Sequence, residues 1–136
     1  QEGLIEIQKA HKDINNKVIA NAPKDIVINT HVCRGNFHST YANSGAYDPV
    51  ADILFGEENV DAYYLEFDDE RSGNFEPLRF IPNDKKVVLG LVTTKLPTLE
   101  DKEVIKQYKS INKVWKRVNI STNLKYLSNP ESIQAP

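Results

Sequence analysis

The residues best suited to chemistry lie in residues 30–36, a polar stretch that directly follows the apolar run at residues 26–28. The stretch holds His31 and Cys33, and Cys33 is the only cysteine in the chain. Side chains alternate between the faces of a β-strand, so these two point the same way, roughly 7 Å apart. An imidazole and a thiolate at that spacing can bind one metal ion, with Zn²⁺ the first candidate. An incidental pair of strand neighbours is the competing interpretation.

A carboxylate stands near the end of the next predicted strand. Residues 60–68 are predicted to form that strand, and Glu66 stands near its end. Functional groups collect at the carboxyl ends of parallel strands, and His, Cys and Glu together make a nitrogen, sulfur and oxygen ligand set for zinc. The alternative for Glu66 is a plain ion pair with a basic neighbour such as Arg34 or Arg71. The next strand end carries polar groups as well, Thr93, Thr94 and Lys95.

The elements that must position these groups alternate between helices and strands. An apolar stripe of helical spacing, Leu4, Ile7, Ile14 and Val18, predicts a helix over residues 4–20. Asp48 and Pro49 suit the start of a second helix through Leu54. Strands are predicted at residues 25–33, 60–68, 86–93 and 118–122, a short helix or turn at 75–80, and a long helix at 100–115. Nearly continuous apolar strands alternating with helices predict an α/β fold with a parallel sheet covered by helices.

Bulk properties narrow the class of protein. The chain has 136 residues, which is enough for one domain spanning residues 1–136. A net charge of −2 argues against a nucleic-acid partner or an anionic membrane surface held by bulk electrostatics. No apolar stretch approaches the roughly 18 residues of a membrane span. A single cysteine fits the reducing cytoplasm, which is the expected location.

Three motifs together resemble a known family. They are His-Val-Cys-Arg-Gly-Asn-Phe-His-Ser-Thr at residues 31–40, Leu-Glu-Phe-Asp-Asp-Glu-Arg-Ser-Gly-Asn-Phe-Glu-Pro-Leu at 65–78, and Val-Leu-Gly-Leu-Val-Thr-Thr-Lys at 88–95. Over about residues 10–125 the chain resembles the C-terminal half of the catalytic barrel of cobalamin-independent methionine synthase, and most closely its short, single-barrel relatives. The resemblance implies the C-terminal half of a (β/α)₈ TIM-type barrel, with about four strands.

The resemblance also implies a site. In that family zinc is held by a His and a Cys on one strand, a Glu on the next and a second Cys near the last strand. His31, Cys33 and Glu66 match the first three ligands, whereas Leu124 stands at the place of the second Cys. Thr94-Lys95 replaces a His that the classical enzymes carry. Candidate substrate contacts are Asp68, Glu70, Arg71 and Ser72.

The implied reaction is zinc-dependent methyl transfer from a donor, expected to be of the folate type, to the thiol of homocysteine, giving methionine. Half a barrel lacks most of a donor site, so weak or absent activity is expected of this chain alone. Open sheet edges predict a homo-oligomer, or pairing with a missing N-terminal half. The alternative is a non-catalytic half barrel with a vestigial metal site that self-associates. A thiol acceptor other than homocysteine is a third possibility.

Overall fold

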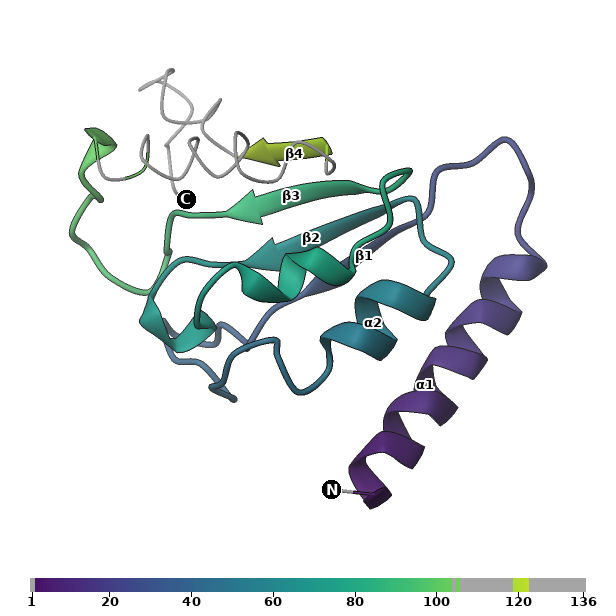
Figure 1. Ribbon diagram of the computed structural model, residues 1–136. Helices are drawn as coiled ribbons and strands as arrows, with labels where there is room; N and C mark the ends of the chain where they lie inside the picture. Colours follow the sequence, from purple (N-terminus) through teal and green to yellow (C-terminus); the bar gives the residue numbers. More distant parts are fainter. Residues whose placement is uncertain (1, 104, 106–118, 123–136) are drawn as a thin grey trace.

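The computed structural model describes residues 2–103, 105 and 119–122, and its centre is a parallel sheet (Figure 1). The strands are β1 (Asn29–Val32), β2 (Ala62–Glu66), β3 (Lys86–Gly90) and β4 (Asn119–Thr122). Their order in the sheet is β1-β2-β3-β4, and each neighbouring pair is parallel. The predicted α/β class with parallel strands is therefore confirmed.

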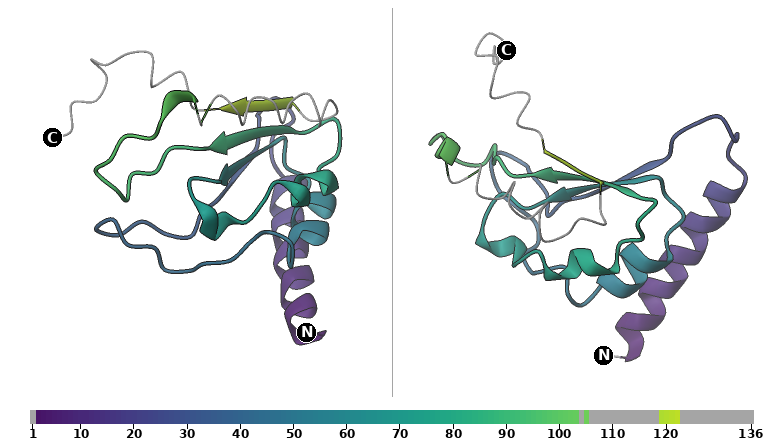
Figure 2. Two further views of the ribbon diagram at one scale, coloured as in Figure 1. Left: turned by 60° about the vertical axis from the view of Figure 1, so that its left-hand side comes forward. Right: turned by 45° about the horizontal axis from the view of Figure 1, so that its top comes forward.

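One face of the sheet carries the hydrophobic core. The register pairs Val32 with Leu65 and Leu65 with Leu89, so these side chains share a face. Helix α2 (Ala51–Glu57) and the 3₁₀ helix η2 (Glu76–Phe80) lie against that side of the sheet (Figure 2). The fully buried side chains of the strands and of these two helices meet there; they are Tyr63, Leu65, Val87, Leu89, Phe55 and Leu78.

The opposite face of the sheet is open along β1 and part of β2. The register places His31 beside Tyr64 on this face, and Tyr64 beside Val88. The side chains of His31 and Cys33 are exposed, and Tyr64 is 42% exposed. The helices α1 (Glu2–Ala20), α2 and η2 all lie on the other side of the sheet (Figure 2). Two of the candidate ligands, His31 and Cys33, are thus accessible rather than buried in the core.

The first helix is close to its predicted extent, but its apolar stripe is exposed. Helix α1 covers Glu2–Ala20, as the spacing of apolar residues indicated. However, the apolar stripe is not buried, and no residue of α1 is. The exposed fractions are 50% for Leu4, 56% for Ile7, 58% for Ile14 and 69% for Val18. An apolar stripe of this kind ordinarily packs against a core, and in the described structure this one does not.

Polar contacts explain this orientation of α1. Asn16 donates a hydrogen bond to the carbonyl oxygen of Glu57 (2.8 Å), and Asn15 donates one to the Glu58 carboxylate (2.8 Å). Lys12 forms an ion pair with Glu57 at 2.9 Å. These partners all belong to α2 or the residues just after it, so the polar side of α1 turns toward α2. Since β1 is the edge strand, no strand of the described sheet lies beyond it to receive the apolar stripe.

Several predicted boundaries differ from the structure. Helix α2 begins at Ala51 rather than at Asp48-Pro49, and its N-cap residue Val50 makes no side-chain capping bond. Strands β1, β2 and β3 are shorter than residues 25–33, 60–68 and 86–93, and the residues outside them include apolar ones such as Ile26, Val27 and Leu91. The short helix at 75–80 is present as η2. Most of the predicted helix at residues 100–115 lies outside the described residues.

Where the structure describes the chain, it holds no helix that is both long and apolar enough to cross a membrane.

Candidate functional site

Three sequence-predicted ligands share the open face of the sheet at the carboxyl ends of β1 and β2. Val32 pairs with Leu65, so Cys33, the next residue, comes level with Glu66 at the end of β2. His31 lies two residues before Cys33, which follows the end of β1 directly, and strand alternation predicts the same face for both. In the described part of the chain, no hydrogen bond or ion pair engages the His31 imidazole or the Cys33 thiol. Both donors are thus free to bind a ligand.

The Glu66 carboxylate is already occupied. It is 8% exposed, and its Oε1 atom lies 2.6 Å from the Lys95 ammonium. Its Oε2 atom accepts a hydrogen bond from the backbone N–H of Arg34. The guanidinium groups of Arg34 and Arg71 lie farther away, at 3.7 and 3.8 Å. The ion pairs that the sequence left open are therefore present, but the nearest cation is Lys95 rather than either arginine.

Asp68 continues this charged cluster. Its side chain is 4% exposed, and Oδ2 lies 3.1 Å from the Lys95 ammonium. Burial acts to raise the pKa of Asp68, but hydrogen bonds from Thr93 and Lys95 outweigh it and hold that pKa below its ordinary value. For Lys95, burial acts to lower the pKa, yet Glu66 and Asp68 together raise it above its ordinary value. Lys95 is thus held charged between two carboxylates.

The turn after β2 fixes Arg71 beside the two carboxylates. Asp69 accepts hydrogen bonds from the Arg71 backbone N–H (2.9 Å) and from its Nε (2.6 Å), which starts the 3₁₀ helix η1 (Glu70–Ser72). The Arg71 guanidinium also lies over the Tyr41 ring, 4.1 Å from its centroid. Gly73 ends η1 with φ = 71°, a left-handed conformation that glycine adopts without strain. The turn thereby directs the Arg71 side chain back toward Glu66 and Asp68.

Tyr47 and Arg34 tie the ends of β1 and β2 together beneath the cluster. The Tyr47 hydroxyl accepts a hydrogen bond from the Glu66 backbone N–H (3.0 Å) and lies 3.2 Å from the Val32 carbonyl oxygen. Arg34 donates to the Glu66 carbonyl oxygen (3.1 Å) and to that of Gly45 (2.9 Å). Burial raises the pKa of Tyr47 and keeps its hydroxyl protonated. These contacts fix where Cys33 and Glu66 leave the sheet.

The donor set suits zinc by type, but the described conformation does not gather it into a binding site. In residues 2–103, 105 and 119–122, no three His, Cys, Asp or Glu side chains lie close enough together to hold a metal ion. Glu66 is in addition already engaged, because its two oxygens contact Lys95 and the Arg34 N–H. A metal ion on this face therefore has to displace Lys95. Leu124, at the place of the family's second Cys, lies outside the described residues.

The predicted substrate contacts divide into two groups. Asp68 and Arg71 belong to the charged cluster, and Ser72 is 1% exposed with an Oγ atom that has no hydrogen-bond partner in the described structure. Glu70 is exposed. The sequence-based site missed Lys95 and Tyr47. Lys95 could be found from the sequence as a polar residue after a predicted strand. No local sequence pattern shows that Tyr47, which lies in a loop, reaches Glu66.

Comparisons with known proteins find similarity to two longer chains. YxjH of Bacillus subtilis (strain 168) is 50% identical over 93 residues, which is 68% of this chain and 25% of YxjH. YxjG of the same organism is 46% identical over 93 residues, again 68% of this chain and 25% of the relative. Both are described as uncharacterized proteins. The chain thus spans about a quarter of the length of these curated relatives. No protein-family model and no solved structure matches it.

Proposed function

We propose that this chain is the metal-binding half of a zinc-dependent methyltransferase that acts on the thiol of homocysteine. In this proposal its β/α units are the last four of a (β/α)₈ barrel, and the open face of the sheet is the barrel interior. The resemblance of three motifs to cobalamin-independent methionine synthases suggests the reaction. One observation of the fold supports the proposal: the register pairs Val32 with Leu65, so the residues that follow, Cys33 and Glu66, leave the sheet at the same end of neighbouring strands.

In the proposed site, His31, Cys33 and Glu66 hold the zinc ion. When bound, zinc supplies Lewis acidity that lowers the pKa of a coordinated thiol and favours the thiolate at neutral pH. Arg34 contributes by position, because its backbone N–H fixes one oxygen of Glu66 and its side chain anchors the strand end. That contact keeps the carboxylate on the open face, where the other two donors lie.

The charged groups beside Glu66 suit the polar end of an amino-acid substrate. Arg71 is a cation that a substrate carboxylate can pair with, and Asp68 is an anion that an ammonium group can pair with. They lie 3.7 Å apart and next to the proposed ligand Glu66. We propose that Asp68, Arg71 and Ser72 orient the acceptor, with Glu70 at the edge of the same turn.

Metal content of the purified chain tests the proposal directly. We expect about one zinc per chain by elemental analysis after exchange into zinc and removal of the excess. Cys33→Ser and Glu66→Gln should each lower the bound zinc severalfold, because each removes one of only three protein ligands. The matched control is His38→Asn, which changes a nearby exposed histidine at a positive φ that asparagine tolerates. Metal-free wild type, or unchanged zinc in Cys33→Ser, would contradict the proposal.

A further inference from the structure

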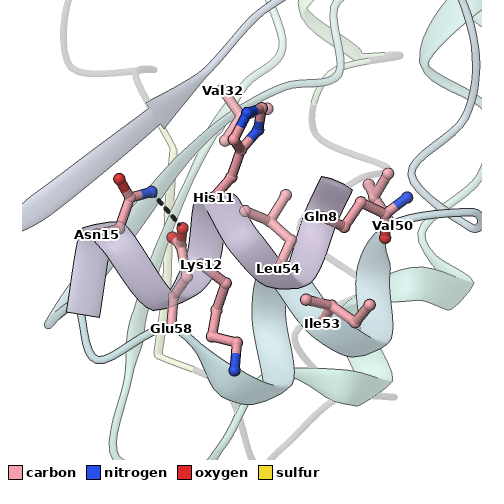
Figure 3. A pocket seen from close by; sticks show the side chains of 9 residues that line it. All are labelled: Gln8, His11, Lys12, Asn15, Val32, Val50, Ile53, Leu54 and Glu58. Carbon is pink, nitrogen blue, oxygen red and sulfur yellow. Dashed lines mark hydrogen bonds between the residues drawn. The ribbon is translucent and has the colours of Figure 1, made fainter. Parts of the chain in front are cut away.

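A cavity lies between α1 and α2, on the side of the sheet that carries the helices. Its volume is about 320 Å³, at the lower end of the range for small-ligand sites. Figure 3 shows side chains of both helices around it. Its apolar lining comes from β1, from α2 and from the residue before α2, namely Val32, Val50, Ile53 and Leu54. An apolar cavity of about 150 Å³ can hold a benzene ring, so this one has room for an apolar body of roughly ten carbon atoms.

One wall of the cavity carries a buried carboxylate with an unused oxygen. Glu58 follows α2 directly and is 6% exposed. Its Oε1 atom accepts a hydrogen bond from Asn15 of α1 (2.8 Å, Figure 3), whereas Oε2 has no hydrogen-bond partner in the part of the chain that the structure describes. Lys12 lines the same cavity, but its ammonium pairs with Asp13 (2.8 Å) and Glu57 (2.9 Å). Burying a carboxylate is costly unless it is paired, so the free oxygen of Glu58 favours a ligand that supplies a positively charged donor.

The other unpartnered polar atom of the lining is also an acceptor. Gln8 donates through Nε2 to the Pro49 carbonyl oxygen at 3.3 Å, which leaves its Oε1 without a partner among the described residues. Gln8 and Asn15 lie about two turns apart on α1, or roughly 10 Å along the helix axis. The cavity therefore has one free acceptor near each of these residues and apolar side chains between them. This distribution favours a ligand that donates hydrogen bonds over an anion.

We propose that this cavity binds a small primary amine with an apolar body of roughly ten carbon atoms, whose ammonium group pairs with Glu58. An ammonium supplies both the donor and the charge that Glu58 lacks, and a hydrogen bond between charged groups is about twice as strong as a neutral one. The apolar body removes the surface of Ile53 and Leu54 from water, which contributes the non-directional part of the affinity. The site is separate from the proposed zinc ligands His31 and Cys33, which stand on the open face of the sheet.

Isothermal titration calorimetry of the whole chain with phenylbutylamine, in the presence of a chelator, tests the proposal. Phenylbutylamine has an apolar body of the required size and one ammonium group, and phenylbutanol is its neutral counterpart. We expect the amine to bind once per chain, with a dissociation constant of about 100 μM or below. Phenylbutanol should bind about tenfold more weakly, because its hydroxyl brings no charge to Glu58. Equal affinities for the two compounds, or no saturable binding of the amine, would overturn the proposal.

Replacing Glu58 shows whether its charge selects the amine. Glu58→Gln keeps an oxygen that can accept the hydrogen bond from Asn15 but removes the negative charge. It should weaken binding of phenylbutylamine about tenfold and leave that of phenylbutanol unchanged, so the preference for the amine disappears. The matched control is Glu76→Gln, which removes a carboxylate that is 64% exposed in η2 and should bind both compounds as wild type does. A preference for the amine that persists in Glu58→Gln contradicts the proposal.

A second variant tests where the apolar body lies. Leu54→Trp places a larger side chain in the cavity and should weaken both compounds about tenfold, with circular dichroism confirming that the variant folds. In wild type, the methyl resonances of Val50, Ile53 and Leu54 should shift when the amine is added. Binding that leaves these resonances unchanged, or that is undiminished in folded Leu54→Trp, would place the ligand elsewhere and refute the assignment. Since zinc is absent throughout, the proposed function is judged separately.

Discussion

At the scale of single residues, Lys95 is the most informative side chain of the site. Its ammonium lies between Glu66 and Asp68, whose side chains are 8% and 4% exposed. Two carboxylates so close together and so little hydrated need a cation, and Lys95 supplies it. The same position makes Lys95 a competitor for any metal ion that uses Glu66. It stabilises the metal-free chain and opposes metal binding.

Replacing Lys95 should therefore lower the stability of the fold and raise its affinity for a metal ion. Lys95→Met keeps the length of the side chain but frees Glu66 and removes one positive charge, so zinc affinity should rise by about tenfold or more. The folding free energy should fall by about 1–3 kcal/mol, because two buried carboxylates lose their nearest partner. Competition with a chromophoric chelator gives the affinity, and urea unfolding gives the stability.

Controls decide whether the effect belongs to the site. Lys95→Arg retains the charge and should leave zinc affinity near that of wild type. Lys24→Met removes an exposed lysine elsewhere and should change neither quantity. If Lys95→Met bound zinc no more tightly than wild type, Lys95 would not compete for Glu66.

The lowered pKa of Asp68 predicts how the free energy of unfolding depends on pH in the acidic range. Its pKa is lower in the folded chain than the ordinary value of 3.8, so the unfolded chain takes up the proton first as pH falls. The stabilisation is complete above the ordinary value and is lost as pH falls through the lower, folded-state value. Urea unfolding between pH 6 and pH 2 should thus show a loss below about pH 4 that is smaller in Asp68→Asn. Asp84→Asn, at a side chain that is 73% exposed, should keep the slope of wild type.

At the scale of elements, the turn that carries Arg71 depends on one glycine. Gly73 has φ = 71°, and a Cβ atom placed there would lie 2.5 Å from the Cβ of Ala46. Gly73→Ala should therefore cost about 1–3 kcal/mol of folding free energy through strain and this clash. Gly3→Ala is the matched control, because Gly3 lies in α1 with no atom within 4 Å of an added Cβ, and alanine favours a helix. Thermal unfolding of both variants measures the difference, and equal midpoints would contradict the strain argument.

The elements also show what local sequence pattern can and cannot predict. Apolar periodicity placed α1 and the four strands correctly, because the period of each element is a local property. The pattern could not show which way α1 faces, since that depends on hydrogen bonds from Asn15 and Asn16 to residues more than 40 positions away. The predicted cap at Asp48 failed for a similar reason: Tyr47 is drawn to Glu66, and the helix starts only at Ala51.

The candidate site shows the same contrast: some of its features follow from the local sequence, and others depend on contacts between distant segments. Alternation along a strand is local, so the sequence could predict that His31 and Cys33 share a face, although β1 itself ends at Val32. The charges around Glu66 come from three separate segments, and their distances follow from strand register and loop path. Spacing within the sequence therefore named Arg34 and Arg71 as partners, whereas the closest cation was Lys95, 29 residues away.

At the scale of the whole molecule, two surfaces are exposed in the described structure. They are the open face of the sheet and the outer side of α1. The first carries the proposed donors His31, Cys33 and Glu66, and the second carries the exposed apolar residues Leu4, Ile7, Ile14 and Val18. They lie on opposite sides of the sheet (Figures 1 and 2). The proposed metal site and the exposed apolar side of α1 are therefore separate surfaces of the chain.

The proposed function then predicts metal binding without turnover. In the proposed half barrel the described residues offer donors for a metal ion and charged groups for an amino acid, but the opposite wall of a barrel would have to hold the methyl donor. The zinc-loaded chain, given homocysteine and a methyl-folate, should therefore form no methionine above the rate without protein, as followed by mass spectrometry. YxjH, four times as long as the matched segment, is the comparison under the same conditions. Methionine formed by this chain, and lost in Cys33→Ser, would show that four β/α units hold both substrates.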